Sequence, residues 1–304
     1  MPRPDDAPGW LSALRPWRNC VRMVLLAFAA AASVSASSSR LPLSPHAGLG
    51  QSPPRVVDIY PSAERLPANL LRMYIVFSAP MAVGESHSRL RLVDDAGRTV
   101  DRAFLALDEE LWDPSGRRLT VLFDPGRIKR GLRANLEMAP PLREGHRYRL
   151  IVDAGWPDAQ GRRLGEPHVK TFEALVACRT RPDPGTWSIQ PPEAHTRTPL
   201  VLQFDAPLDR ALLFTSIAVV DERGETVPGT IEVSAGEREW SFTPARPWAP
   251  GGYGVHVAPE LEDPAGNSLE RVFDAELSSG GSAPPTAAGL TREFIVGPGR
   301  PSPS

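Results

Sequence analysis

Short, mostly apolar runs separated by polar turns recur along most of this chain. Examples are YIVF from Tyr74, LRLV from Leu90, LTVLF from Leu119 and YRLIV from Tyr148. The runs are rich in Leu, β-branched and aromatic residues, and Asp-x-x-Gly turns such as DDAG and DAQG lie between them. Short strands at roughly ten-residue spacing with turn signals between them are typical of a β-sandwich. Long 3.6-residue apolar periodicity is missing, so we expect only single helical turns, near Asp209 to Phe214 or within residues 126–141.

The same pattern occurs twice in the chain. YIVFSAPM from Tyr74 matches VLQFDAPL from Val201, and VDDAGRTV matches VDERGETV at the same offset of 127 residues. Further along, YRLIV from Tyr148 matches YGVHV from Tyr253, and PDAQGRRL matches EDPAGNSL, at an offset of 105 residues. The first copy therefore carries an insertion of about twenty residues, part of which is residues 126–141. A unit repeated in this way predicts two domains of one fold.

Each copy resembles the bacterial Ig-like domain of the S-layer-protein type. That family has an early F-S-x-P-M/L element, which corresponds here to Phe77–Met81 and Phe204–Leu208, and a late D-x-x-G-N turn. The late turn is complete at Asp263–Asn267, whereas Arg162 replaces the Asn in the first copy. The resemblance implies an Ig-like sandwich for each copy. Members of the family are mostly spacers, adhesion modules and accessory domains of secreted or surface proteins, so it also implies a non-catalytic role.

The expected fold is all-β, with two tandem Ig-like β-sandwich domains after a disordered N-terminal signal and linker region. The predicted divisions are a signal peptide at 1–36, a flexible linker at 37–54, sandwich 1 at 55–176, a linker at 177–186, sandwich 2 at 187–297 and a disordered tail at 298–304. Alternating strand positions predict a core of Ile75, Phe77, Leu90, Leu92, Leu122, Tyr148, Leu150 and Val152, and of Leu202, Phe204, Ile217, Val219, Trp240, Phe242, Tyr253 and Val255. Tyr148 and Tyr253 each follow a Gly-containing turn, which predicts that their hydroxyls bond to upstream backbone, as in a tyrosine corner.

The N-terminus matches a secretory signal. Basic residues up to Arg22 precede the apolar run MVLLAFAAAA, Met23 to Ala32, and small residues follow at Val34 and Ala36. The run is shorter than the about 20 apolar residues that cross a bilayer. We therefore predict a secreted, periplasmic or cell-surface protein with no membrane span after cleavage. An uncleaved N-terminal anchor is the alternative.

The charge and cysteine content narrow the classes of partner. The 304 residues carry a formal net charge of −2, and cleavage after Ala36 removes four Arg and two Asp, which makes the charge −4. An acidic balance gives no electrostatic case for a nucleic-acid partner. Cleavage also removes Cys20, which leaves Cys178 alone in the predicted linker. A single cysteine cannot form an internal disulfide.

Candidate catalytic and metal-binding residues are scattered. The sequence lacks G-x-S-x-G, H-E-x-x-H and P-loop motifs, and its six histidines are dispersed. The acidic runs Asp108–Glu110 and Asp94–Asp95 place neighbouring carboxylates on opposite faces of a strand, which suits a glycosidase poorly. Asp158 and Asp263 either bind calcium through turn oxygens or cap their own turns, and we favour capping. We predict no enzyme activity and no cofactor, with an unrecognised hydrolase as a further alternative.

Two binding alternatives concern copper and aromatic side chains. Small periplasmic copper carriers have a similar sandwich, and His46–Ala47 before Phe77–Pro80 resembles their start, although no D-x-H or H-x-H follows in the second half. A periplasmic copper carrier is therefore the alternative function. The exposed-aromatic alternative is a stacking platform for sugars or peptides, against the favoured role of anchoring loops. It concerns Trp112, Trp156, Trp187 and Trp248.

The insertion at residues 126–141 is the predicted binding surface. It carries Arg127, Lys129, Arg130 and Arg133, so it is locally basic on an acidic protein, and the second copy lacks it. Loops on a rigid scaffold are where binding commonly resides. The predicted function is an exported, non-catalytic Ig-like protein that acts as a structural, binding or adhesion module of the cell envelope. Its predicted partner is an envelope protein or polysaccharide.

Overall fold

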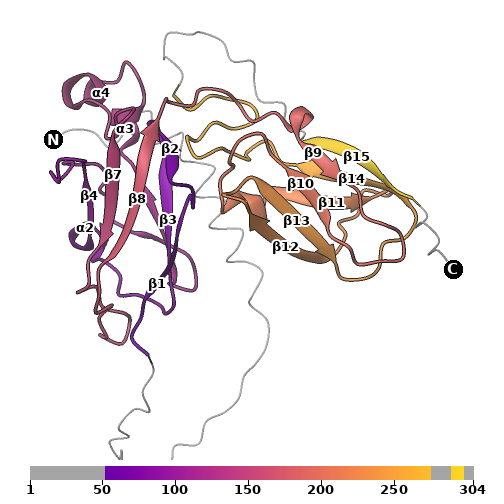
Figure 1. Ribbon diagram of the computed structural model, residues 1–304, viewed down its shortest axis with the longest axis horizontal. Coiled ribbons are helices and arrows are strands. Elements are labelled where there is room, and N and C mark those ends of the chain that lie inside the picture. The colour runs from indigo at the N-terminus through magenta and orange to yellow at the C-terminus, as the bar shows by residue number, and fades with distance from the viewer. Residues whose placement is uncertain (1–51, 275–288, 298–304) are drawn as a thin grey trace, which may run out of the picture. The chain divides into compact units, whose positions relative to one another are not determined.

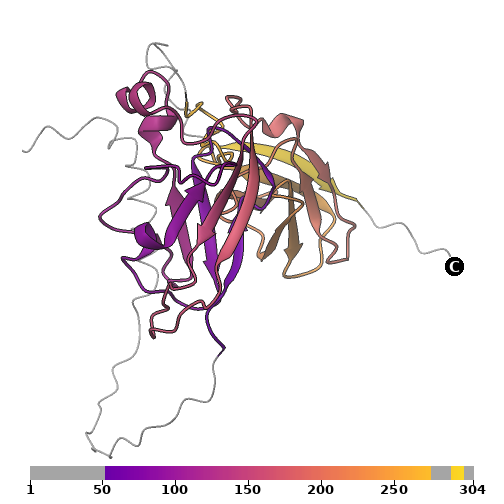
Figure 2. The same ribbon diagram turned by 60° about the vertical axis from the view of Figure 1, so that its left-hand side comes forward.

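The computed structural model describes residues 52–274 and 289–297 (Figures 1 and 2). These residues belong to one compact unit, Ser52–Ser304. The strands of the first copy are β1 (Val56–Tyr60), β2 (Arg65–Pro67), β3 (Arg72–Phe77), β4 (Leu90–Val93), β5 (Leu111–Trp112), β6 (Arg118–Leu122), β7 (Arg147–Val152) and β8 (His168–Leu175). Those of the second copy are β9 (Ser188–Gln190), β10 (Leu200–Gln203), β11 (Ile217–Asp221), β12 (Gly229–Ser234), β13 (Glu239–Pro244), β14 (Gly251–Val257) and β15 (Leu290–Val296). The all-β class is confirmed.

Strands β9 to β15 form a seven-stranded sandwich with Ig topology. One sheet, in the order β12-β13-β10-β9, joins the fourth, fifth, second and first of these strands, and the sheet β11-β14-β15 joins the third, sixth and seventh. This is the division of strands in an Ig constant-type domain. The first copy repeats it with the sheets β1-β3-β6-β5 and β4-β7-β8, and β2 pairs in parallel with the outer edge of β8. The two halves of the chain therefore share one topology, as a duplicated unit requires.

The turns repeat together with the strands. The equivalent bridges are Val93 with Thr99 and Val220 with Thr226, and Pro157 with Arg163 and Glu262 with Ser268. In the late turns, one oxygen of Asp158 accepts hydrogen bonds from two backbone N–H groups of its own turn, and Asp263 does the same. Gly161 and Gly266 complete these turns at φ of +80° and +81°, a conformation that favours glycine. The capping interpretation of both Asp residues is confirmed.

Each copy has its own hydrophobic core, built from the inward faces of its two sheets. The predicted positions are buried with two exceptions. Tyr253 is only partly buried, although it packs against the second core. Leu122 was assigned to the wrong face, because β6 turns Leu119 and Val121 inward. The run LTVLF is apolar at nearly every position, so alternation alone does not fix which face it buries.

Both tyrosine corners are confirmed. The Tyr148 hydroxyl accepts a hydrogen bond from the backbone N–H of Arg143 at 2.8 Å. The Tyr253 hydroxyl donates to the carbonyl of Ala249 at 3.2 Å. Each bond ties the start of a central strand to the turn that precedes it.

Helical segments are short. They are α2 (Ser86–Arg89), α3 (Pro125–Ile128), α4 (Arg133–Met138), η2 (Pro184–Thr186) and η3 (Leu212–Phe214). Those in the insertion and near Asp209 to Phe214 lie where the sequence predicts helical turns, whereas the turns at Ser86–Arg89 and Pro184–Thr186 were not predicted. Across residues 52–274 and 289–297, none of the helices has the length and apolar character to cross a bilayer. The predicted signal at 1–36, most of the linker at 37–54 and the tail at 298–304 lie outside the described residues.

Candidate functional site

The two copies differ in length on both sides of β6. Tyr74 pairs with Thr120 across the first copy's sheet, and the equivalent Val201 pairs with Ser241 in the second. The partners are thus 46 residues apart in the first copy and 40 in the second, so six extra residues precede Thr120. They fall in the edge of the sheet formed by β5. In the second copy the edge strand β12 is six residues long and pairs with β13 along its length. The equivalent edge strand of the first copy, β5, has only two residues that pair with β6.

The other length difference is the insertion. From Thr120 to the corner residue Tyr148 is 28 residues, and from Ser241 to Tyr253 is 12, so sixteen extra residues follow β6 in the first copy. The segment 126–141 accounts for them, and it contains α3 and α4. Both departures of the first copy from the second therefore flank the same strand.

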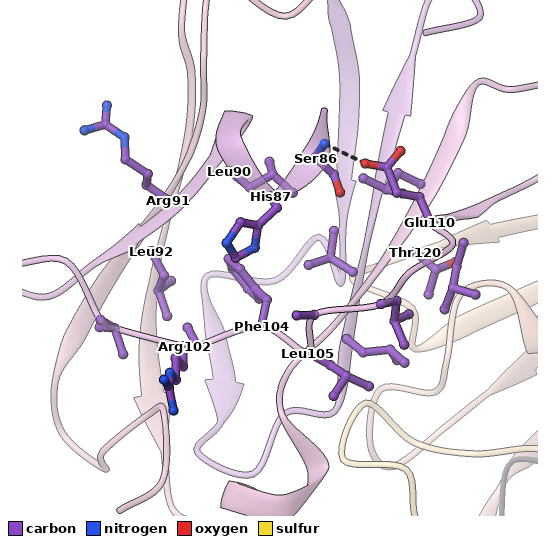
Figure 3. A pocket seen from close by; sticks show the side chains of 18 of the residues that line it. Ser86, His87, Leu90, Arg91, Leu92, Arg102, Phe104, Leu105, Glu110 and Thr120 are labelled. Atoms are coloured by element: carbon purple, nitrogen blue, oxygen red, sulfur yellow. Dashed lines mark hydrogen bonds between the residues drawn. The ribbon is translucent and has the colours of Figure 1, made fainter. Parts of the chain in front are cut away.

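A cavity of about 440 Å³ opens at the interrupted edge (Figure 3). It lies between β4 of one sheet and β6 of the other, and the chain from 99 to 108 forms part of its wall. Its wall mixes apolar residues of β4 and β6 with polar and charged residues. Figure 3 shows His87 and Phe104 in its middle, with Arg91 and Arg102 on one side and Glu110 on the opposite side. A volume of this size suits a small molecule or a few inserted side chains.

Glu110 fixes the mouth of the cavity. Its carboxylate accepts hydrogen bonds from the backbone N–H groups of Gly84 and Ser86 at 2.8 and 2.6 Å, and from the Trp112 indole at 2.7 Å. Partial burial would raise the pKa of Glu110, but these donors together lower it. The carboxylate is thereby held charged and ties the loop before α2 to β5.

Hydrogen bonds from Arg127 join the insertion to the wall of the cavity. The Arg127 guanidinium donates to the carbonyls of Asp101 and Arg102, two residues of the cavity wall, at 2.7 and 2.9 Å. It also donates to the carbonyls of Ala139 and Met138, at the end of α4, at 2.8 and 3.3 Å. Since Arg127 is buried, its charge serves this internal network. We refer to the cavity, residues 84–111 with 119–122, and the insertion, residues 126–141, together as the edge site.

The other predicted binding residues take different places. Lys129 lies half-buried, with its Nζ 4.3 Å from the centre of the Phe273 ring. Burial lowers the pKa of Lys129, and the positive charge of Arg271 lowers it further. Arg130 reaches the buried Asp274, which accepts from its backbone N–H at 3.0 Å. Both thus join the insertion to a segment of the second copy. Arg133 is 89% exposed and forms a surface ion pair with Glu137 at 2.6 Å. Whether these residues bind a partner stays a prediction.

Two apolar residues of the insertion were not singled out from the sequence. Every residue of α4 is at least partly exposed, and Leu136 and Met138 are 75% and 36% exposed. The end of α4 is held by hydrogen bonds from the buried Arg127, so the positions of Leu136 and Met138 on the surface are fixed. Their signal in the sequence is two apolar residues in a segment without strand periodicity, beside the basic residues on which the binding prediction rests.

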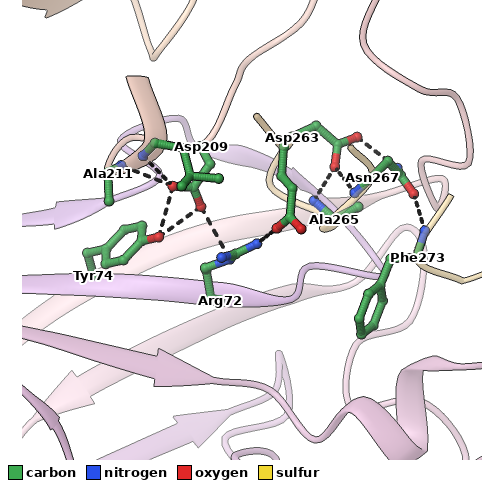
Figure 4. Close-up of polar contacts among 10 residues, drawn as sticks. Arg72, Tyr74, Asp209, Ala211, Asp263, Ala265, Asn267 and Phe273 are labelled. Carbon is green, nitrogen blue, oxygen red and sulfur yellow. Dashed lines mark hydrogen bonds and ion pairs between the residues drawn. The ribbon is translucent and has the colours of Figure 1, made fainter. Parts of the chain in front are cut away.

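A second group of buried polar residues lies where segments of the two copies meet (Figure 4). Arg72 on β3 is 1% exposed and forms ion pairs with Asp209, at 3.2 Å, and with Glu262. The Tyr74 hydroxyl donates to Asp209, with both carboxylate oxygens at 2.9 Å. Burial lowers the pKa of Arg72, but Asp209, Tyr74 and Asp263 together more than offset this and raise it, and burial beside Asp209 raises the pKa of Tyr74. The cluster therefore holds a charged Arg72 and a neutral Tyr74.

Hydrogen bonds hold the predicted linker, residues 177–186, in place at Cys178 beside this cluster. The backbone of Cys178 donates to the side chain of Asn69 and accepts from it, and the Asn267 amide donates to the same Cys178 carbonyl. The Cys178 thiol lies 3.2 Å from a carboxylate oxygen of Asp263. Burial raises the pKa of both Asp263 and Cys178. These contacts give Cys178 a structural environment and keep it as a thiol.

The structure also bears on the aromatic and copper alternatives. Trp156, Trp187 and Trp248 are buried in the cores, so the stacking-platform alternative is wrong for them and their role is to anchor loops. Trp112 is partly buried and packs against Phe77, with the centres of the two rings 5.7 Å apart. His46, on which the copper alternative rests, lies outside the described residues. Among the residues that are described, no group of His, Cys, Asp and Glu could hold a metal ion.

Comparisons with known proteins give only distant likenesses. No protein-family model and no curated protein sequence matches the chain. Among solved structures, the S-layer protein rSbsC(31-844) is similar at 12% identity and a TM-score of 0.28, over 68% of this chain and 24% of that one. Native alpha-2-macroglobulin from Escherichia coli, domains MG0-NIE-MG1, is similar at 10% identity and a TM-score of 0.26, over 67% of this chain and 66% of that one. The tandem Ig repeats of Dlar are similar at 10% identity and a TM-score of 0.24, over 71% of this chain and 93% of that one. The Ig-like assignment rests on the strand order and not on these likenesses.

Proposed function

We propose that this protein is an exported, non-catalytic module of the cell envelope that binds an envelope protein or polysaccharide through the edge site of its first sandwich. The proposal includes the bacterial Ig-like kinship of the S-layer type that the duplicated motifs suggest. One observation carries it. The two places where the first copy is longer than the second meet at a single edge, where Arg127 of the insertion bonds to the wall of the cavity.

The second copy serves as an internal reference. It folds with the same strand order without the sixteen-residue insertion and with a full-length β12, so neither departure is needed to form this sandwich. Loops added to a rigid sandwich commonly carry binding. The buried cluster around Arg72 supports a further part of the proposal, namely that the two sandwiches act as a fixed pair that presents the edge site.

Capture from envelope extract tests the binding role. The bait is the chain from Ser52 onward, and the variant is Leu136→Glu, which changes an exposed side chain and leaves the cores intact. The matched control is Ile295→Glu, because Ile295 is equally exposed, at 74%, on β15 of the second copy. The proposal expects a protein or polysaccharide that binds the parent and the control and is lost from the variant. A set of captured molecules that is identical for all three baits would refute it.

Export is tested separately from binding. Residues 1–51 fused to a reporter enzyme that is active only outside the cytoplasm give activity if the Met23 to Ala32 run directs export. Replacing Leu25 and Leu26 with Arg is the control that abolishes the apolar run. Equal reporter activity from both fusions contradicts the assignment to the envelope.

A further inference from the structure

The edge site carries a projecting helix with exposed apolar side chains and an open recess on the same part of the first sandwich. The projection is α4, where Leu136 is 75% exposed and Met138 extends the apolar surface. The recess is the cavity of about 440 Å³ between β4 and β6. The bonds from Arg127 to Asp101 and Arg102 hold the two features side by side. A helix that exposes Leu136 and Met138 next to an open cavity with both apolar and polar lining is a surface that can be covered by its own counterpart.

The charges on the projection match those around the recess. On α4, Arg133 and Glu137 are four residues apart and share a helix face with Leu136. Figure 3 shows Arg91 and Arg102 on one side of the cavity and Glu110 on the opposite side. Asp108 also lines the cavity, and Asp108 and Glu109 directly precede Glu110 in the chain. Arg133 therefore matches the acidic side and Glu137 the basic side, which gives an inserted helix a defined direction.

These charged groups are available for an intermolecular contact. Asp108 and Glu109 are exposed, and neither forms a hydrogen bond or ion pair within the described ranges. The Arg133–Glu137 pair is exposed to solvent at 89% and 57% of its two side chains. A pair this exposed contributes little to stability, so its members can exchange partners at small cost.

We propose that the occupant of the edge site is a second copy of this chain, with α4 of each copy inserted into the cavity of the other. This inference rests on the proposed function, because it names the partner of the same site. Since the projection and its complement lie side by side, the reciprocal insertion closes on itself as a two-fold dimer and not as a filament. Leu136 is the apolar anchor, and Arg133 facing Asp108 and Glu109 fixes the register.

Sedimentation equilibrium of the chain from Ser52 onward tests this directly. The parent protein self-associates to a dimer as its concentration rises, and Leu136→Glu weakens the dimer at least about tenfold, which corresponds to 1.4 kcal/mol. Ile295→Glu leaves the dimer unchanged. A parent that stays monomeric, or a Leu136→Glu variant that dimerises like the parent, overturns the proposal.

A charge exchange gives the sharper result. Arg133→Glu alone and Asp108→Arg/Glu109→Arg alone each place like charges across a homodimer, so each variant dimerises more weakly than the parent. Mixed in equal amounts, the two variants form a heterodimer in which both contacts are again between opposite charges, and association returns. A mixture that associates no better than its components refutes the reciprocal contact. If the parent is monomeric and Leu136→Glu still loses a captured envelope molecule, self-association is wrong while the proposed function stands.

Discussion

Replacing Arg72 with Met should produce a large loss of stability, because the side chain is the cation of a dry cluster. Arg72 lies on β3 of the first sandwich, and its partners Asp209 and Glu262 come from the second half of the chain. The Arg72 and Asp209 side chains are 1% and 2% exposed. Met keeps an unbranched apolar stem but is shorter and removes the charge, so the Asp209 and Glu262 carboxylates are left without this counterion.

The expected cost follows from that geometry. Removing one member of a buried ion pair costs about 3–5 kcal/mol, because the remaining charge stays desolvated. The Tyr74 hydroxyl still donates to Asp209, which places the expected loss near the lower end of that range. Because the cluster joins segments that contribute to different cores, part of the loss should appear as separate unfolding of the two sandwiches.

Urea unfolding followed by tryptophan fluorescence measures both effects. Trp156 and Trp240 are completely buried, one in each core, so each sandwich contributes to the signal. The control is Arg98→Met, since Arg98 is 77% exposed and its ion pair with Asp94 contributes less than about 1 kcal/mol. If Arg72→Met lowers the free energy of unfolding no more than Arg98→Met does, the cluster does not hold the sandwiches together as described.

Three further predictions concern single substitutions. Arg127→Met should leave four carbonyls without their donor and increase amide hydrogen exchange in the insertion, while exchange in the second sandwich stays unchanged; equal protection in both proteins would show that Arg127 does not position α4. Gly161→Ala should cost about 1 kcal/mol for its left-handed backbone alone, and Gly266→Ala about 1–3 kcal/mol more, because its new Cβ meets the Leu71 side chain; thermal unfolding that ranks the pair in the other order contradicts the packing of this turn. Asp158→Asn should destabilise at neutral pH. Burial raises the pKa of Asp158, but hydrogen bonds from Arg162 and the turn lower it overall, so the stabilisation is present above the ordinary Asp pKa and is lost as the pH falls through the lowered value; a difference between the two proteins that is independent of pH would be evidence against this.

Local signals predicted the strands, their turns and the duplication well because these signals act within one copy. An Asp that caps its turn and a Gly at positive φ specify the same hairpin wherever the pair occurs, as at Asp158–Gly161 and Asp263–Gly266. Their recurrence at constant offsets is enough to recover a duplicated sandwich. Where the local signal is ambiguous, the prediction fails, as it does at Leu122 in a run with almost no polar residue to mark the outer face.

The edge site was only half predictable for a different reason. Charge in a sequence gives the number of basic residues but not their direction, and Arg127 turns inward to four carbonyls while Arg133 turns outward. The cavity depends on β5 being cut to two residues, which is a property of pairing with β6 and not of the local sequence. Residues brought together by tertiary pairing have no signature at any fixed spacing.

The late D-x-x-G turn makes different contacts in the two copies, and the residue after its Gly differs accordingly, Arg162 in the first copy and Asn267 in the second. In the first copy Arg162 follows Gly161, extends partly into solvent and pairs with Asp158, and no heavy atom lies within 4 Å of the Cβ that Gly161 lacks. In the second copy the equivalent residue is Asn267, which is completely buried and donates to both Asp263 and the Cys178 carbonyl. A guanidinium at this position could not be accommodated beside the clamped linker, whereas an Asn supplies a short donor. The departure of the first copy from the D-x-x-G-N pattern is therefore explained by packing. Only the second copy's turn is docked against the other copy, where the backbone N–H of Leu71, the residue before β3, donates to the carbonyl of Pro264 at 2.9 Å.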